Sequence, residues 1–538
     1  MNHSVPRSVS RSIARQLRFT TLKSCLLVSA LCGISGQSAE LMAAELTELW
    51  EGGNWRAVTQ ITLFDNQLWF TNSNPFRDAN AADIYSMDLT SREVRFRRSL
   101  FSQDTGVTTV FDGHLYLPFE DPRRSTGRGE YVVTDGKKFQ WHAFNQGRAF
   151  HVHTMQQCGD ALYAATGAYT GQLQKQNSAN EWELVYKYPE GDASFSRIVS
   201  LHEFKNRCMF SAAARNDSRP KLLEYRNGNA TEVPGWPSGD RTDHLTTFKD
   251  KLLAFNDIKN DRSLLSWNGK KVRSVKLPGG HPRGMSSDNK KLWLISDQKN
   301  GGILWSTTDL KKWKEEHRFT DKPVDLVVSG TSVFIGTWNK QGGGRLYQVS
   351  IGEPSNELPV ETPAAKPLAD LPVAKISAAE IKTRVERYMD RFTDPALQGG
   401  DFNALRKTLS ALDQQEHPDV VEALSARVPS LGDTGSVQVF TGRNISRSKL
   451  INWYVIGAAA RRGVAIIDPE LVKIPFTRKP NSAQKYFETS VIAITATTWS
   501  KHRRDELITA LVRRSATEVN DPEWLRHDIR SALHVLTQ

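Results

Sequence analysis

The clearest pattern in the chain is a recurring alternation of apolar and polar positions that predicts short β-hairpins. In each copy an apolar or aromatic position precedes a tight polar turn such as Asp65-Asn66, Asp112-Gly113 or Lys205-Asn206. These turn residues tolerate positive φ or bond their own backbone, so they close hairpins between alternating strands. The anchor positions after the turns are spaced 40 to 47 residues apart: Leu68, Leu115, Leu162, Cys208, Leu252, Leu292 and Val333.

A third strand follows each hairpin, for example Asp83–Met87 or Lys221–Tyr225, and a second turn such as Asn227-Gly228 often precedes an outer strand. Three or four short strands in about 45 residues are typical of a propeller blade, and blades are stable only as a complete ring. Residues 45–352 are therefore predicted to form a seven-bladed β-propeller. We expect Leu46–Trp50 to pair beside Leu346–Val349 and close the ring, which protects an edge strand.

The blades resemble those of kelch and sialidase-type, Asp-box propellers of secreted bacterial-type proteins. The resemblance rests on Ser306-Thr-Thr-Asp309-Leu-Lys-Lys-Trp313, which is similar to one Asp-box turn, although it lacks the glycine and its Asp-to-Trp spacing is one residue short. In those families the turn is structural: the Asp caps a hairpin and the Trp packs between blades. The resemblance thus implies a fold and no particular activity.

The period changes after the propeller. Residues 353–374 contain five prolines and no periodicity, so they are predicted to form an extended interdomain linker. Residues 375–538 show helical spacing, beginning with a capping box at Ser377 and Glu380. They predict an all-helical C-terminal domain. The complete chain is therefore predicted to be a multidomain β + α protein. Asp521–Leu536 resembles one HEAT-type repeat, and a compact helical domain without repeats is the alternative.

The N-terminus predicts export. Arg7, Arg11, Arg15, Arg18 and Lys23 precede the apolar run 25–34, which is long enough for a signal peptide and too short to span a membrane. Residues 1–44 are therefore read as a signal peptide, with no transmembrane segment after its cleavage and a periplasmic or extracellular location.

Two cysteines remain in the processed chain, Cys158 and Cys208. An oxidising compartment permits a disulfide between them, and two small buried apolar side chains are the other interpretation.

Charge and motifs limit the partners. The formal net charge is +12, of which +4 belongs to residues 1–44 and +8 to the rest of the chain. A basic excess of this size fits contact with polyanions, such as acidic glycans, and plain solubility is the other interpretation. Searches for a Gly-x-Ser-x-Gly, a His-Glu-x-x-His, a phosphate loop and a dinucleotide fingerprint find none. The sequence therefore predicts no cofactor, no metal and no specific nucleic-acid binding, and it identifies no catalytic residue.

Polar residues at or just before the predicted inner strands are the candidate ligand-binding residues. They could converge on the channel from different blades: Arg56, His151, His153, Arg197, Asp243, His244, Arg283 and Asp325. His151 and His153 have the spacing of two metal ligands on a strand, but no third ligand is identifiable. The arginines suit a carboxylate or sulfate. A hydrated channel lining without a ligand is the simplest alternative.

Two functions remain open. The favoured one is an exported, non-enzymatic binding or scaffold protein that uses a propeller face for a protein or an anionic glycan. The alternative is a carbohydrate-active hydrolase or lyase at the channel mouth, which needs two carboxylates or a base beside a cation.

Overall fold

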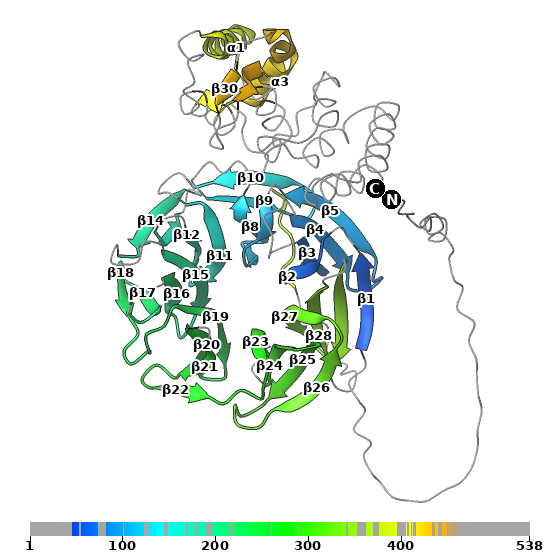
Figure 1. Ribbon diagram of the computed structural model, residues 1–538, viewed down its shortest axis with the longest axis vertical. Helices are drawn as coiled ribbons and strands as arrows, with labels where there is room; N and C mark the ends of the chain where they lie inside the picture. The colour runs from blue at the N-terminus through cyan, green and yellow to red at the C-terminus, as the bar shows by residue number, and fades with distance from the viewer. Residues whose placement is uncertain are drawn as a thin grey trace, which may run out of the picture. The chain divides into compact units, whose positions relative to one another are not determined.

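A computed structural model describes residues 46–351 with short gaps, residues 362–368, residues 376–394 and shorter stretches up to Ala458. The gaps in the first range are 53–54, 74–81, 101, 123–128, 145–148, 168–169, 178–180, 190–195, 215–216, 218, 260, 289 and 340–342. Strands β1 to β29 form a ring of small antiparallel sheets around a central axis, which is the arrangement of a β-propeller (Figure 1).

The strand pairings within the described residues give seven four-stranded units, here called blades 1 to 7. Blade 1 holds β2 (Ala57–Phe64), β3 (Gln67–Ser73), β4 (Ala82–Asp88) and β5 (Val94–Leu100). In blade 2 the inner strand is split into β6 (Ser102–Thr105) and β7 (Thr109–Phe111), followed by β8 (His114–Pro122), β9 (Glu130–Thr134) and β10 (Phe139–Ala143).

The next blades repeat this order. Blade 3 holds β11 (His151–Cys158), β12 (Ala161–Gly167), β13 (Gln172–Gln176) and β14 (Trp182–Lys187). Blade 4 holds β15 (Ser196–Glu203), β16 (Cys208–Ala214), β17 (Leu222–Arg226) and β18 (Asn229–Glu232). Blade 5 holds β19 (Arg241–Phe248), β20 (Lys251–Ile258), β21 (Asp261–Trp267) and β22 (Val272–Val275).

The last two blades complete the ring. Blade 6 holds β23 (His281–Ser287), β24 (Leu292–Gln298), β25 (Gly301–Thr307) and β26 (Lys314–Phe319). Blade 7 holds β27 (Lys322–Ser329), β28 (Ser332–Trp338) and β29 (Gly344–Ser350), and its fourth strand is β1 (Leu46–Gly52) from the start of the described chain.

The closing strand confirms the expected clasp. Leu46 pairs with Val349 and Trp50 with Leu346 in an antiparallel ladder. Arg345 reinforces this pairing, since its Nη2 lies 2.8 Å from Oε1 of Glu51. Because the first and last strands share one blade, both ends of the repeat are fixed by backbone hydrogen bonds.

The hairpin turns have the backbone that their residues predict. Asp65 and Asn66 both adopt positive φ, at 50° and 55°, and Lys205 and Asn206 do the same at 52° and 58°. Two consecutive positive φ values give a turn whose twist matches that of the flanking strands. The hairpin signal in the sequence is therefore confirmed at these positions.

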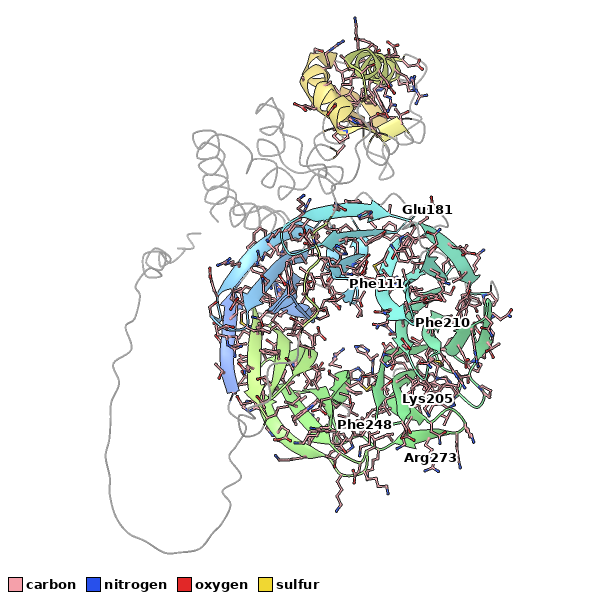
Figure 2. The ribbon with its side chains drawn as sticks, turned by 180° about the vertical axis from the view of Figure 1, so that it is seen from behind. Phe111, Glu181, Lys205, Phe210, Phe248 and Arg273 are labelled. Carbon is pink, nitrogen blue, oxygen red and sulfur yellow. A yellow bond between two sulfur atoms is a disulfide. The ribbon has the colours of Figure 1, made fainter. Side chains whose placement is uncertain are left out.

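The hydrophobic core lies between blades and not within them. Seven apolar clusters each combine residues of two neighbouring blades, for instance Phe210 with Tyr163 across blades 3 and 4, or Trp293 with Ile335 across blades 6 and 7. Figure 2 labels Phe210 within the blade sheets. A single blade leaves both faces of its sheet exposed, and packing on its neighbours buries them.

Blades 3 and 4 are also joined covalently. Cys158, at the end of β11, forms a disulfide with Cys208, at the start of β16, with the two Cα atoms 5.4 Å apart. Of the two interpretations left open by the sequence, the disulfide is the one observed.

The turn that resembles an Asp-box is structural here too. Oδ1 of Asp309 accepts hydrogen bonds from the amides of Lys311 and Lys312, both at 2.8 Å. The indole Nε1 of Trp313 donates to the carbonyl of Lys276 in the preceding blade, at 3.0 Å. The Asp thus caps the turn and the Trp connects two blades.

Part of the proline-rich segment contacts the propeller. Residues 362–368 do not span free space but lie against the turns of blades 1 and 2. The amide of Lys366 donates to the carbonyl of Gly113, its ammonium pairs with Asp112, and the amide of Leu368 donates to Asp135. Prolines remove donors only at their own positions, so the residues between them remain able to bind the propeller.

Short helices follow in the C-terminal part. Helix α1 (Ala378–Thr393) begins at Ser377, whose Oγ accepts a hydrogen bond from the amide of Glu380 as expected for a capping box. Helix α3 (Pro418–Arg427) and the 3₁₀ turn Val428–Leu431 come next. Three buried leucines of the predicted second helix, Leu405, Leu409 and Leu412, are also helical.

The expectation of an all-helical domain is wrong at one point. Strands β30 (Ser436–Gln438) and β31 (Asn444–Ser446) pair as an antiparallel hairpin. Three-residue strands are too short to show a period of two, so the pattern did not reveal them. The predicted signal peptide 1–44 and the predicted helices beyond residue 458, including the HEAT-like pair, lie outside the described residues.

Candidate functional site

The inner strands carry a bulge at nearly the same place in six blades. The register between inner and second strand shifts around His153 in β11, Val199 in β15, His244 in β19, Arg283 in β23 and Val324 in β27, and in β2 between Thr59 and Thr62. A bulge re-aims the side chain of its extra residue. Three of the predicted site residues are therefore bulge residues.

All of these positions lie near one face of the ring, here called the mouth face. It is the face where inner strands begin and second strands end, as the pairs His151–Gly167, Arg241–Asp257, His281–Asp297 and Lys322–Trp338 define. Side chains from the start of one strand and the end of the next therefore meet there.

The first cluster surrounds Glu120, at the end of β8. Its Oε2 lies 2.6 Å from Nδ1 of His153, and its Oε1 lies 3.4 Å from Nδ1 of His151 and 3.8 Å from Nη1 of Arg197. The two imidazole rings are stacked, with centroids 5.4 Å apart. Both oxygens of this carboxylate are thus occupied by groups of the protein.

The electrostatics of this cluster follow from burial and charge. Burial works to raise the pKa of Glu120, but the charge and hydrogen bond of His153, together with His151 and Arg197, lower that pKa to about 2. Burial lowers the pKa of His151 to about 4, against the opposing effect of Glu120. Glu120 is therefore ionised and His151 neutral at neutral pH.

The second cluster surrounds Asp243, a buried residue of β19. Its Oδ2 lies 2.6 Å from Nε of Arg241, its Oδ1 lies 3.0 Å from Nδ1 of His244, and Arg262 pairs with the same Oδ1. Burial opposes ionisation, but His244 and the two arginines hold the pKa of Asp243 well below its usual range. This carboxylate is also saturated on both oxygens.

The third cluster differs. Asp297, at the end of β24, uses one oxygen for both of its cations: Oδ2 accepts from Nε and Nη2 of Arg283 at 2.8 and 2.5 Å, and Nζ of Lys322 lies 3.7 Å from it. Its other oxygen, Oδ1, is buried and has no partner among the described residues. The side chains of Arg283 and Lys322 are 36% and 40% exposed.

A pocket lies beside this third cluster. Its volume is about 190 Å³, and it is lined by Arg283, Asp297, Lys322, Val324 and Trp338. The residues come from β23, β24, β27 and β28, so blades 6 and 7 build it together. Two cations, one carboxylate, one indole and one aliphatic side chain thus face a single small space.

The two remaining predicted residues have other surroundings. Asp325 accepts hydrogen bonds from the amides of Ile61 and Leu326, at 2.7 and 2.9 Å, so it ties blade 7 to blade 1. Burial raises the pKa of Asp325 to about 6, although these amides oppose the shift. Arg56 precedes β2, and its carbonyl accepts a hydrogen bond from the amide of Asn339.

The mouth face thus brings the predicted residues together only in part. His151, His153 and Arg197 share one carboxylate, Asp243 and His244 belong to a second cluster, and Arg283 to a third. Arg197, His244 and Arg283 therefore belong to three ion clusters on the same face. The described contacts give each of the three its own carboxylate.

Several residues of these clusters were not predicted from the sequence: Glu120, Arg241, Arg262, Asp297, Lys322 and Trp338. Glu120, Asp297 and Trp338 end second strands, which return to the mouth face after the hairpin turn. The position of the hairpin turn gives a usable signal for such residues. An antiparallel hairpin places the first residue of its inner strand opposite the last residue of its second strand, so the two lie at similar distances before and after the turn.

Within the described part of the chain, no group of three His, Cys, Asp or Glu side chains is arranged to hold a metal ion. No described helix is long and apolar enough to cross a membrane.

Comparison with known proteins gives matches among solved structures, all at low sequence identity. No family model and no curated protein matches the chain. Among solved structures, a virginiamycin B lyase from Staphylococcus aureus is similar with 12% identity and a TM-score of 0.45, covering 57% of this chain and 99% of the lyase. The β-propeller domain of the Trilobed protease from Pyrococcus furiosus is similar with 10% identity and a TM-score of 0.39, covering 55% and 95%. The strand pairings of the described residues show a mostly β protein with a propeller over residues 46–351.

Proposed function

We propose that this chain is an exported, non-enzymatic binding protein whose seven-bladed propeller holds an anionic ligand at the mouth face, with a separate, largely helical C-terminal domain. The observation that carries the proposal is that partly exposed cations on several blades are each held by a buried carboxylate. Arg241, Arg283 and Lys322 are 36% to 47% exposed, whereas Asp243 and Asp297 are at most 9% exposed.

This arrangement suits binding because it fixes positive charge on rigid strands. A cation held by a buried acid loses little further side-chain freedom when it meets an anion. Charge-assisted hydrogen bonds from arginine to carboxylate or sulfate are also stronger than neutral ones. The disulfide between Cys158 and Cys208 supports the exported location, since such bonds persist in oxidising compartments.

The mouth face offers little to a general acid or base. The two carboxylates with depressed pKa, Glu120 and Asp243, are occupied by cations. Burial raises the pKa of Asp104 and Asp325, which accept hydrogen bonds from Thr59 and Thr105, and from Ile61 and Leu326. Burial also raises the pKa of Asp257, whose Oδ2 lies 3.4 Å from Nη1 of Arg262. The oxygens of Asp104 and Asp325 therefore serve contacts between and within blades.

The test is a glycan array probed with the full-length chain. Acidic glycans should give signal and their neutral counterparts should not, and the signal should fall as salt rises, because exposed charges are screened. Equal binding of neutral and acidic glycans, or none of either, would contradict the proposal.

A hydrolase or lyase at the channel mouth is the second candidate, favoured by Glu120 with His151, His153 and Arg197. A carboxylate beside a histidine and an arginine is a known kind of acid–base pair. If this candidate is right, Glu120→Gln removes turnover of a bound acidic glycan and leaves its binding intact. If the binding proposal is right, the wild-type chain leaves that glycan unchanged.

A further inference from the structure

We propose that the pocket between blades 6 and 7 binds the acidic end sugar of a glycan, a hexuronic acid, through Arg283, Lys322 and Trp338. This inference rests on the proposed function of the mouth face and names the ligand class for one part of it.

The size of the pocket restricts the ligand to one ring. Pockets for drug-sized molecules measure roughly 300–1,000 Å³, and this one measures about 190 Å³. It is lined by residues of only four strands. A single pyranose with a carboxylate fits that scale, and the rest of a glycan would extend out over the mouth face.

The charges of the pocket favour an anion. Two cations face one carboxylate, so the lining has a net charge of about +1. Arg283 uses Nε and Nη2 on Asp297, and its Nη1 and the ammonium of Lys322 make no hydrogen bond to any described residue. A ligand carboxylate can accept from both groups, one oxygen on each.

The position of Asp297 fixes these donors. Its side chain is 9% exposed, and it engages Arg283 through one oxygen only. The guanidinium is thereby held through Nε and Nη2, and its Nη1 is not used on Asp297. Arg283 is also a bulge residue, so the backbone itself directs the side chain out of the regular strand.

The walls of the pocket favour a sugar over a fully apolar ring. Trp338 and Val324 are partly buried and supply apolar surface, while three charged side chains form the rest of the lining. An apolar ring would desolvate those charges without hydrogen bonds in return. A pyranose has C–H groups on its face for the indole and hydroxyl groups on its edge for the charged side chains.

Backbone pairing holds the two key walls together. Lys322 and Trp338 are directly opposite each other in the β27–β28 ladder. Gly302 is packed so closely that a Cβ there would lie 2.1 Å from Cδ of Pro323, the neighbour of Lys322. The pocket is therefore set by the joint between two blades and requires no induced closure.

The experiment is isothermal titration of the full-length protein with D-glucuronate, D-glucose, glucose 6-sulfate and acetate. We expect glucuronate to bind at least about tenfold more tightly than glucose or acetate. Arg283→Ala should weaken glucuronate binding by about tenfold, and Trp338→Ala by a similar factor. Trp338→Phe retains a ring and should weaken it less.

Arg273→Ala is the matched control, because Arg273 is an exposed arginine on the outer strand β22, labelled at the periphery of the ring in Figure 2. It should leave binding unchanged, and thermal unfolding of every variant should check that the propeller is intact.

The outcomes separate the two proposals. If acetate binds as tightly as glucuronate, the mouth face binds anions but the sugar inference is wrong. If glucose 6-sulfate binds more tightly than glucuronate, the acidic group is a sulfate and the uronic acid assignment is wrong. If no anion binds, both the inference and the proposed function are overturned. If glucuronate binds equally to wild type and Arg283→Ala, the ligand lies elsewhere and this pocket is not the site.

Discussion

Two sectors of the same ring use a carboxylate in opposite ways. In blades 2 to 4, Glu120 gives both oxygens to His151, His153 and Arg197, and a disulfide joins blades 3 and 4 at the opposite end of their strands. In blades 6 and 7, Asp297 gives one oxygen to Arg283 and Lys322, and a pocket lies beside the pair.

The difference lies in what remains for a ligand. Around Glu120 both oxygens of the carboxylate are used by groups of the protein, so removing the carboxylate disturbs the fold. Around Asp297 the cations keep donors that no described residue uses, so removing one should disturb binding more than folding. One repeated scaffold can therefore hold a structural ion cluster in one joint and a binding pocket in another.

The largest expected effect concerns the disulfide. The double variant Cys158→Ala, Cys208→Ala should lower the free energy of unfolding by about 2–4 kcal/mol, because the bond closes a long loop in the unfolded chain. Chemical denaturation with and without reductant measures it. Reductant should destabilise the wild type and leave the variant unaffected, and a wild type indifferent to reductant would contradict the account of this sector.

Glu120→Gln should come next, lowering the free energy of unfolding by about 2 kcal/mol at pH 7, because it leaves His153 and Arg197 without their ionised partner. Glu232→Gln, at an exposed site on β18, is the control and should change little. An equal loss in both variants would show that Glu120 has no special structural role.

The pH dependence sharpens this prediction. The pKa of Glu120 is lowered to about 2 in the folded state, so its contribution is present above its ordinary pKa and is lost as pH falls from about 4.5 to about 2. The difference in unfolding free energy between wild type and Glu120→Gln should therefore shrink over that range. A difference that stays constant below pH 3 would argue against the shift.

Asp104 tests the same sector through a pKa that is raised and not lowered. It is a buried carboxyl opposite Glu120 in the β6–β8 pair, and burial raises its pKa to about 7 against the hydrogen bonds that it accepts. The folded state then binds the proton more tightly, so stability is lost as pH rises from about 4 to about 7. Asp104→Asn should be more stable than wild type by about 1 kcal/mol at pH 8, with no gain at pH 4. A gain that is equal at both pH values would contradict this.

Asp297→Asn should have the smallest effect on folding. Its cations are partly exposed and remain solvated, so we expect a change of about 0.5 kcal/mol in the free energy of unfolding at pH 7. The measurement is the same denaturation series as for Glu120→Gln. A loss as large as that of Glu120→Gln would remove the contrast between the two sectors.

The sequence predicts the propeller well because its evidence is repeated. Turns such as Asp65-Asn66 specify hairpins locally, and one spacing recurs around the ring, so an error in one copy is outweighed by the others. Only part of the site is predicted: its cations are, and the acids that hold them are not. Cations such as Arg283 lie at the start of inner strands, which the sequence pattern identifies as the strands that line the channel. The acids that hold these cations end second strands or come from another blade.

Two features could not be read from the sequence for physical reasons. The bulges that aim His153, His244 and Arg283 each add one residue to a strand, which a pattern of period two does not register. The docking of residues 362–368 depends on amides between prolines meeting turns some 230 to 300 residues earlier. Only the folded chain brings those groups together.

The most direct test of the central claim is a crystal structure of the protein soaked with D-glucuronate. The account predicts the carboxylate between Arg283 and Lys322 with the ring against Trp338, and no ligand at Glu120, whose oxygens are occupied. Ligand density around Glu120, His151 and Arg197 with an empty pocket between blades 6 and 7 would contradict it.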